Sequence, residues 1–185
     1  SVLIPSLYKR EEMLLNLLSN LYNQIAELRA WLKVEVIVLQ DNKEITTGMK
    51  RNRLLNLAKG EYIVFIDDDD EVYNNYLKRI LGALETGLDC VGTSGHYSID
   101  GGHKMTWKLS MAYHDYDGHD GILYRRANHL TPVKRNLALA AMFPDKSNAE
   151  DKEYSERLSK FLKSEIVIDE PIYHYKYQSY NKEYV

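Results

Sequence analysis

Four consecutive aspartates, Asp67 to Asp70, are the residues of this chain best suited to chemistry. They follow Tyr62–Ile66, a short run of aromatic and β-branched residues typical of a buried strand. Adjacent carboxylates repel one another, which raises their pKa values. A hard divalent cation such as Mg²⁺ or Mn²⁺ relieves this repulsion, because such ions prefer carboxylate oxygen. A solvated acidic turn that caps the next helix explains the same residues equally well, and both interpretations stay open at this point.

The elements around this cluster alternate between strands and helices. Apolar runs predict further strands over 1–5 and 34–39, and helical spacing predicts helices over 11–32, 46–58 and 75–85. This βαβαβα order predicts an α/β fold with a Rossmann-like, mostly parallel central sheet flanked by helices. The aspartates then lie at the carboxyl end of their strand, where open α/β sheets bind ligands.

The second half of the chain predicts mixed structure. Asp100-Gly101-Gly102 indicates a hairpin turn between strands over 89–99 and 104–111. The expected elements that follow are a polar loop over 112–121, helices over 134–141 and 150–162, a strand over 165–168 and a tyrosine-rich tail from Pro171. The loop segment His114–Asp120 fits a mobile lid with Gly118 and Gly121 as hinges better than a second metal site. We predict a single domain over 1–185, with a nucleotide-sugar-binding half over 1–95 and an acceptor-side and catalytic half over 96–185.

Composition narrows the class of protein. The 185 residues carry a formal net charge of −3, so the chain offers no general basic surface for nucleic acid. Cys90 is the single cysteine, which excludes an intramolecular disulfide and disfavours a cysteine-based zinc site. No apolar run approaches the roughly 20 residues that a membrane span needs. We expect a soluble, cytoplasmic protein, with the possibility that it is a fragment of a longer one.

Further candidate residues lie at strand and helix ends. Asp41 ends the second strand and can accept a hydrogen bond from a base or a ribose, or simply cap its own turn. Lys50 and Arg51 lie in the first turns of the second helix, where a phosphate would offset their unfavourable interaction with the helix dipole. Asp151, next to Glu150, suits either a capping box led by Ser147 or Asn148 or a general base facing the cleft.

Four segments resemble, in the right order, the small family 2 glycosyltransferases of the GT-A fold. The segments are Ser1-Val-Leu-Ile-Pro-Ser6, Val36-Ile-Val-Leu-Gln-Asp41, the block of Gly48–Asn52 with Ala58–Asp70, and Glu150-Asp151 followed by Arg157-Leu158. The block ending in Asp70 is the most specific match, because it resembles the "ARN … A-GEY-hhh-D-x-DD" pattern of that family. The resemblance spans nearly the whole chain, although residues 92–126 match only loosely.

The resemblance implies a metal-dependent, inverting transfer of a sugar from a nucleoside-diphosphate donor, by family frequency a UDP-sugar, to a hydroxyl acceptor such as a glycan. It implies Asp151 as general base beside Glu150, and Mn²⁺ or Mg²⁺ held by Asp69 with Asp67 and, by a weaker analogy, His174. It implies donor-nucleotide contacts from Pro5, Ser6, Asp41, Lys50, Arg51, Asp67 and Asp68. His129, Lys134 and Trp107 are the expected acceptor-side residues.

Two departures and two alternatives accompany the resemblance. Gln40 replaces the common first acid of the second-strand pair, and Met49-Lys50 replaces the usual small residue before Arg-Asn. A sugar-nucleotide nucleotidyltransferase also uses acids at a sheet edge, but its glycine-rich loop has no counterpart in Pro5–Arg10. A non-catalytic nucleotide- or glycan-binding module of the same fold does not need a base such as Asp151. His174, between two tyrosines, also suits a purely structural histidine.

Overall fold

The computed structural model of the protein describes residues 1–114 and 117–179. Strand β1 (Val2–Leu7) pairs in parallel with β2 (Val36–Asp41) on one side and with β3 (Tyr62–Phe65) on the other. The 3-10 turn η1 (Tyr8–Arg10) and helix α1 (Glu11–Glu27) connect β1 to β2, and α2 (Thr47–Leu57) connects β2 to β3. This confirms the predicted α/β fold class and its parallel first half.

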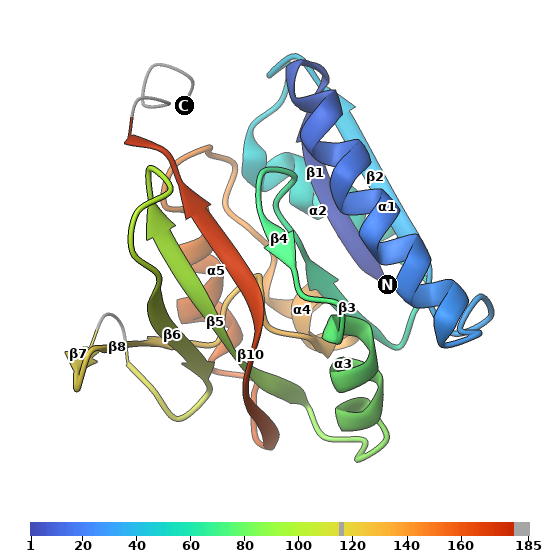
Figure 1. Ribbon diagram of the computed structural model, residues 1–185. Coiled ribbons are helices and arrows are strands. Elements are labelled where there is room, and N and C mark those ends of the chain that lie inside the picture. Colours follow the sequence, from blue (N-terminus) through green and yellow to red (C-terminus); the bar gives the residue numbers. More distant parts are fainter. Residues whose placement is uncertain (115–116, 180–185) are drawn as a thin grey trace.

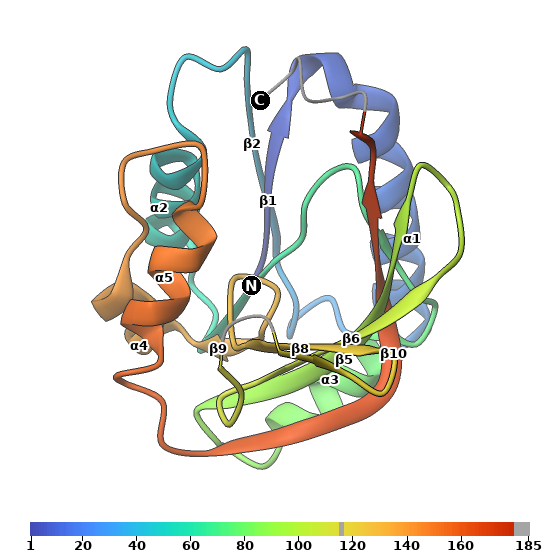
Figure 2. The same ribbon diagram turned by 90° about the vertical axis from the view of Figure 1, so that its left-hand side faces the viewer.

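The two helices bury opposite faces of this parallel unit (Figure 2). Val2 and Ile4 of β1 pack in one apolar cluster with the buried face of α1, whereas Leu3 packs in a second cluster with Leu54 and Leu55 of α2. Successive side chains of a strand point to opposite faces, so an uninterrupted apolar run is what a strand covered on both sides requires.

Helix α1 is shorter than its sequence pattern predicts. The helix ends at Glu27, and Arg29 adopts a left-handed conformation with a φ of 49°. Leu14, Leu17 and Leu21 are buried as the spacing predicts, but Leu32 is fully exposed. The apolar pattern thus continues past the point at which the backbone leaves the helix.

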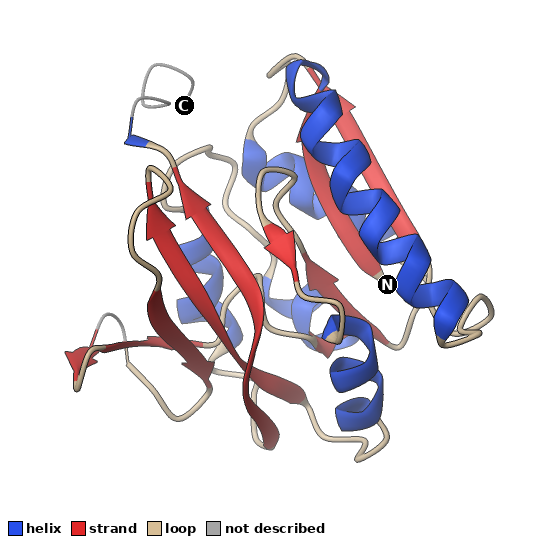
Figure 3. Ribbon diagram, in the orientation of Figure 1, coloured by secondary structure: helices blue, strands red, loops and turns tan. Residues whose placement is uncertain are grey.

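The second half extends the sheet with mostly antiparallel strands (Figures 1 and 3). The added strands are β4 (Glu71–Val72), β5 (Cys90–Ile99), β6 (Met105–Ser110), β7 (Asp117–His119), β8 (Ile122–Arg126), β9 (Val133–Lys134) and β10 (Glu165–Tyr177). The described strands follow the order β2-β1-β3-β9-β5-β6-β8-β7, and β10 pairs with both β4 and β5. The β5–β6 pair is antiparallel, which confirms the predicted hairpin.

Strand β10 corrects the prediction for the end of the chain. It continues from Glu165 through the segment expected to be a separate tail, because residues from Pro171 onward also pair with β5. The tail therefore runs beside β4, directly after the aspartates. Helices α3 (Tyr76–Leu84), α4 (Arg135–Ala141) and α5 (Glu150–Leu158) begin within one residue of the predicted starts, but α5 ends four residues before the predicted end at 162. Among the described residues, no helix combines the length and the apolar character that crossing a bilayer demands.

Candidate active site

The four aspartates after β3 divide into two pairs. The Asp68 carboxylate is buried and accepts hydrogen bonds from Ser6 Oγ at 2.8 Å and Arg10 Nη1 at 2.9 Å. Asp70 is also buried and accepts a bond from the Tyr173 hydroxyl at 2.6 Å. Asp67 and Asp69 keep 24% and 31% of their side chains exposed. Asp67 and Asp69, the predicted D-x-D pair, are therefore the carboxylates available to a ligand. Asp68 instead bonds to residues at and after the end of β1, and Asp70 bonds to β10.

Of these two aspartates, Asp69 has its negative charge less fully neutralised by cations of the protein. Burial and the charges of Asp67 and Asp68 raise its pKa to about 6, although Arg10 Nη1 lies 3.1 Å from its carboxylate. Burial also opposes the ionisation of Asp67, but the neighbouring Arg51 and His129 lower the pKa of this carboxyl well below its ordinary value. Asp69 therefore carries the charge that an added cation would stabilise most.

Arg51 is a buried bridge between two carboxylates from distant parts of the chain. Its guanidinium lies 2.8 Å from Asp67 at the end of β3 and 2.6 Å from Glu150 at the start of α5. Only 4% of the Arg51 side chain is exposed. The unfavourable position of this cation near a helix start is thus offset by two acids of the protein itself.

Helix α2 is held by close contact against the backbone of the segment between α4 and α5. A Cβ on Gly48 would lie 1.9 Å from the Pro144 carbonyl oxygen, so this approach needs glycine. The Asn52 side chain exchanges two 2.9 Å hydrogen bonds with the backbone of Phe143. The predicted capping box on α5 does not form, because Ala149 is the N-cap, with a φ of 55° and no side-chain acceptor.

A second ion pair lies at the end of β2. Lys50 Nζ contacts the Asp41 carboxylate and donates to the Ser6 carbonyl at 2.8 Å. Burial opposes ionisation of Asp41, but the bonds from Lys50 and from the backbone N–H groups of Lys43 and Ile45 lower its pKa. Asp41, Lys50 and Ser6 are therefore brought together at one edge of the sheet, as their places at strand and helix ends predict.

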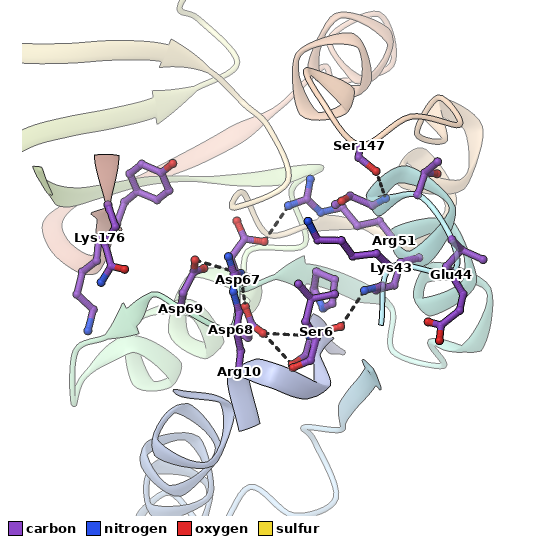
Figure 4. Close-up of a pocket in the computed structure, with 18 of the residues that line it drawn as sticks. Ser6, Arg10, Lys43, Glu44, Arg51, Asp67, Asp68, Asp69, Ser147 and Lys176 are labelled. Atoms are coloured by element: carbon purple, nitrogen blue, oxygen red, sulfur yellow. Dashed lines mark hydrogen bonds and ion pairs between the residues drawn. The ribbon is translucent and has the colours of Figure 1, made fainter. Parts of the chain in front are cut away.

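These residues surround a cavity of about 520 Å³ (Figure 4). Its lining comes from the β1 end, the β2–α2 loop, the start of α2, the aspartates and the end of β10. The lining includes Pro5, Ser6, Arg10, Lys50, Arg51, Asp67, Asp68, Asp69, Ser147, Tyr175 and Lys176. A cavity of this size, with convergent charged groups, suits a small polar ligand.

Asp151 lies beside this cavity and not in its lining. Burial opposes its ionisation, but the charges of His129, Arg125 and Arg51 lower its pKa, so Asp151 is a carboxylate at neutral pH. Arg125 Nη2 lies 3.5 Å and His129 Nδ1 4.0 Å from its Oδ2. An ionised carboxylate next to a ligand cavity has the charge and the place of a proton acceptor.

Three predicted site residues lie elsewhere. His174 is buried on β10 with Nε2 2.9 Å from Ser98 Oγ and Nδ1 3.5 Å from Glu71, and the cavity lining does not contain it. Trp107 packs in the core and donates to the His96 carbonyl. Lys134 pairs with Asp89 at 3.2 Å. The structure thus brings His129 to the acids but does not bring these three residues there. Part of the proposed lid, residues 115–116, lies outside the described residues.

The acidic pair fits a divalent cation that shares its ligands with a substrate. In the described parts of the chain, no cluster of three or more potential ligands forms a complete metal site. Mg²⁺ is commonly held by one or two carboxylates together with substrate phosphates. Asp69 and Asp67 supply that donor set in the cavity lining, and burial together with the charges of Asp67 and Asp68 raises the pKa of Asp69, a shift that a bound cation would oppose.

Sequence reasoning missed Arg10, Tyr173, Tyr175 and Lys176. Arg10 follows β1 at the same edge of the sheet as the aspartates. Its position just after a predicted parallel strand could have identified it as a site residue. The tyrosines and Lys176 carried no signal, because pairing of the tail with β4 and β5 depends on long-range contacts.

Comparison with known proteins agrees with this geometry. The profile described as "Glycosyl transferase family 2" matches residues 46–142. EpsH of Bacillus subtilis (strain 168), which its name assigns to the glycosyltransferases, is 24% identical over 153 residues, covering 76% of this chain and 44% of EpsH.

Solved structures share the fold at low identity. S. aureus TarS 1-349 aligns with a TM-score of 0.67 and 19% identity, covering 95% of this chain and 60% of TarS 1-349. The mannosyltransferase PcManGT from Pyrobaculum calidifontis aligns with a TM-score of 0.58 and 14% identity, covering 94% of this chain and 56% of PcManGT. The chain therefore spans only about half the length of these relatives. Since the family profile covers 97 of its 185 residues, the chain belongs to glycosyl transferase family 2.

Proposed function

We propose that this chain transfers a sugar from a UDP-sugar to a hydroxyl of a glycan or similar acceptor, with inversion at the anomeric carbon. The proposal rests above all on one arrangement, in which Arg51 joins the D-x-D acid Asp67 to the helix start that carries Asp151. A donor-binding cavity and an ionised base thus lie next to each other. The proposed donor residues from the sequence belong to the half over 1–95 and the proposed base to the half over 96–185, and Ser147, Tyr175 and Lys176 of the second half also line the cavity.

The cavity offers separate contacts for each part of the donor. Asp41 at the end of β2 is the proposed acceptor for the base; it lies outside the cavity lining and is joined to it by its ion pair with Lys50. Pro5 and Ser6 line the cavity from β1. Lys50 and Arg51 provide positive charge between these residues and the aspartates. Because both cations already have carboxylate partners, we expect them to orient the diphosphate through electrostatic attraction more than through new direct bonds.

Asp69 and Asp67 are the residues that would hold Mn²⁺ or Mg²⁺. When bound there, such an ion supplies a positive charge that stabilises the departing diphosphate. Asp68 and Asp70 keep the two ligands in place through Arg10 and Tyr173, respectively.

Asp151 is the proposed general base, next to Glu150, whose carboxylate is engaged by Arg51. Asp151 takes the proton from the acceptor hydroxyl as its oxygen forms a bond to the anomeric carbon. The bond from that carbon to the diphosphate oxygen breaks at the same time, and the nucleoside diphosphate leaves with the electron pair. A single displacement from the opposite face inverts the configuration.

The identity of the donor is proposed from the structural relatives. TarS 1-349 has been solved in complex with UDP-GlcNAc and with UDP, and PcManGT in complex with GDP-Man and Mn²⁺. The TarS fold aligns with the higher TM-score, which favours a uridine donor as the first candidate.

Calorimetric titration of UDP, GDP and dTDP, each with and without Mn²⁺, tests the donor class. We expect metal-dependent binding of UDP, and binding of none of the three nucleotides contradicts the proposal. The Asp151→Asn variant separates an enzyme from a pure binding module. We expect the variant to bind UDP as the unmodified chain does but to lose turnover by about 100-fold or more. Unchanged turnover would favour the binding module.

A further inference from the structure

His129 lies between the two acids on which the proposed reaction depends. Its Nε2 is 3.3 Å from Asp67 Oδ2, and its Nδ1 is 4.0 Å from Asp151 Oδ2. Only 9% of the side chain is exposed, and Nδ1 is buried without a hydrogen-bond partner. The imidazole therefore contacts the donor-side acid through one nitrogen and faces the base with the other.

The backbone fixes this position from both sides. The Phe65 N–H donates to the His129 carbonyl at 3.1 Å, which ties the residue to β3 just before Asp67. Ser155 Oγ of α5 donates to the Ala127 carbonyl at 2.8 Å, which ties the helix of Asp151 to the same segment. Within the segment, the Asn128 side chain accepts from the Leu130 N–H at 3.0 Å. Because the segment is bonded to both β3 and α5, a shift of His129 toward Asp67 or Asp151 would also change its contact with the other acid.

We propose that His129 is a positioning residue that links the D-x-D acid Asp67 to the base Asp151. This inference rests on the proposed function, and it replaces the acceptor-side role that sequence analysis gives to His129. Nε2–H donates to Asp67, because an ionised carboxylate can only accept. The Nδ1 edge packs against Asp151 and limits the rotation of its carboxylate. His129 thus connects Asp67 to Asp151, in addition to the connection that Arg51 makes between Asp67 and Glu150.

Two substitutions separate the two edges of the ring. The amide of glutamine reaches about as far as Nε2, whereas the amide of asparagine reaches about as far as Nδ1. His129→Gln keeps a donor for Asp67 and removes the group that faces Asp151. His129→Asn keeps a polar group near Asp151 and removes the contact with Asp67. Glutamine is close to histidine in volume and asparagine is smaller, and urea melts report whether each variant folds.

The two readouts are the affinity for UDP in Mn²⁺ by calorimetry and the rate at which UDP-GlcNAc is hydrolysed to UDP at saturating donor. We expect His129→Gln to bind UDP within about twofold of the unmodified chain and to lose about tenfold or more in kcat, because the carboxylate of Asp151 is no longer held in one orientation. We expect His129→Asn to weaken UDP binding by about tenfold and to keep most of kcat.

A double variant tests whether His129 acts through Asp151. If it does, adding His129→Gln to Asp151→Asn lowers kcat no further, because the base is already lost. Multiplicative losses in the double variant, or equal behaviour of the Gln and Asn variants, overturn the inference. His96→Gln, whose ring contacts the Tyr73 hydroxyl, is the matched control and leaves both readouts unchanged. Absence of UDP binding and of hydrolysis in the unmodified chain refutes the proposed function itself, a result distinct from the ones above.

Discussion

Replacement of Arg51 by methionine tests whether its bridge stabilises the fold. The guanidinium contacts Asp67 at 2.8 Å and Glu150 at 2.6 Å, and its carbon lies 5.5 Å from the centre of the Phe143 ring. Methionine keeps most of the apolar stem and removes the charge. Two carboxylates, with 24% and 9% of their side chains exposed, then lose their shared cation.

The expected cost is large for a domain of this size. Removing one partner of a buried ion pair destabilises a protein by about 3–5 kcal/mol, because the remaining charge stays buried. For a domain of 150–250 residues, this corresponds to a decrease in Tm of about 6–20 °C. From sequence alone, Arg51 is a phosphate-binding cation whose loss weakens nucleotide binding and leaves the fold intact, so the two views predict different outcomes.

Urea denaturation at pH 7, followed by circular dichroism, measures the change in the free energy of unfolding. Arg79→Met is the matched control, because Arg79 pairs with Glu170 on the surface with both side chains about half exposed. Exposed pairs contribute about 0–1 kcal/mol, so the control shifts the midpoint little.

The pH dependence of the stability loss in Arg51→Met shows whether the loss comes from the ion pair with Asp67. Arg51 helps to lower the pKa of Asp67 below its ordinary value of 3.8, and the stability from such a group is present above that value and lost below it. The difference between the unmodified chain and Arg51→Met is therefore largest at neutral pH and shrinks as pH falls below about 4. A loss below about 1 kcal/mol at pH 7, or a difference independent of pH, refutes the buried-bridge argument.

The remaining predictions concern Asp69 and the cap of α2. Asp69→Asn weakens UDP binding in Mn²⁺ by more than about tenfold, and normal affinity in calorimetry contradicts the metal assignment. Because the pKa of Asp69 is raised to about 6, protons compete with the cation below that pH. The Mn²⁺-dependent affinity for UDP therefore falls as pH drops from 7 to 5, and an affinity that does not change over this range speaks against Asp69 as a metal ligand. In the free protein the same shift makes this group's contribution to stability fall as pH rises from about 4 to 6. Thr46 Oγ1 accepts from the Met49 N–H at 3.1 Å, so Thr46→Ala costs about 1 kcal/mol in urea denaturation, and an unchanged midpoint refutes the capping role.

The first half of the fold could be predicted because its signals are local. The run from Tyr62 to Phe65 forms β3 as its composition indicates, and Thr46 caps α2 as a threonine before a helix suggests. Parallel pairing of β1 with β2 and β3 follows from alternating strands and helices. The end of α1 was mispredicted, because Leu28 and Leu32 continue the apolar spacing after the helix has ended.

The sequence by itself determined which residues meet at the carboxyl edge of the parallel strands. Because the alternation of strands and helices makes the strands parallel, Asp41 and the Asp67–Asp70 run, which end two of them, lie at one edge of the sheet. The family pattern in these segments added the expected chemistry of sugar transfer.

Only the tertiary structure decided what each acid contacts. Asp68 bonds to Arg10 and Asp70 to Tyr173, so two of four identical side chains become structural and two remain for a ligand. Arg51 is a buried bridge and not a free phosphate site, because α5, about 100 residues later, brings Glu150 against it. His174 faces Ser98, since the register of β10 on β5 sets the direction of its side chain. Such contacts between distant segments depend on register and packing, which no local pattern encodes.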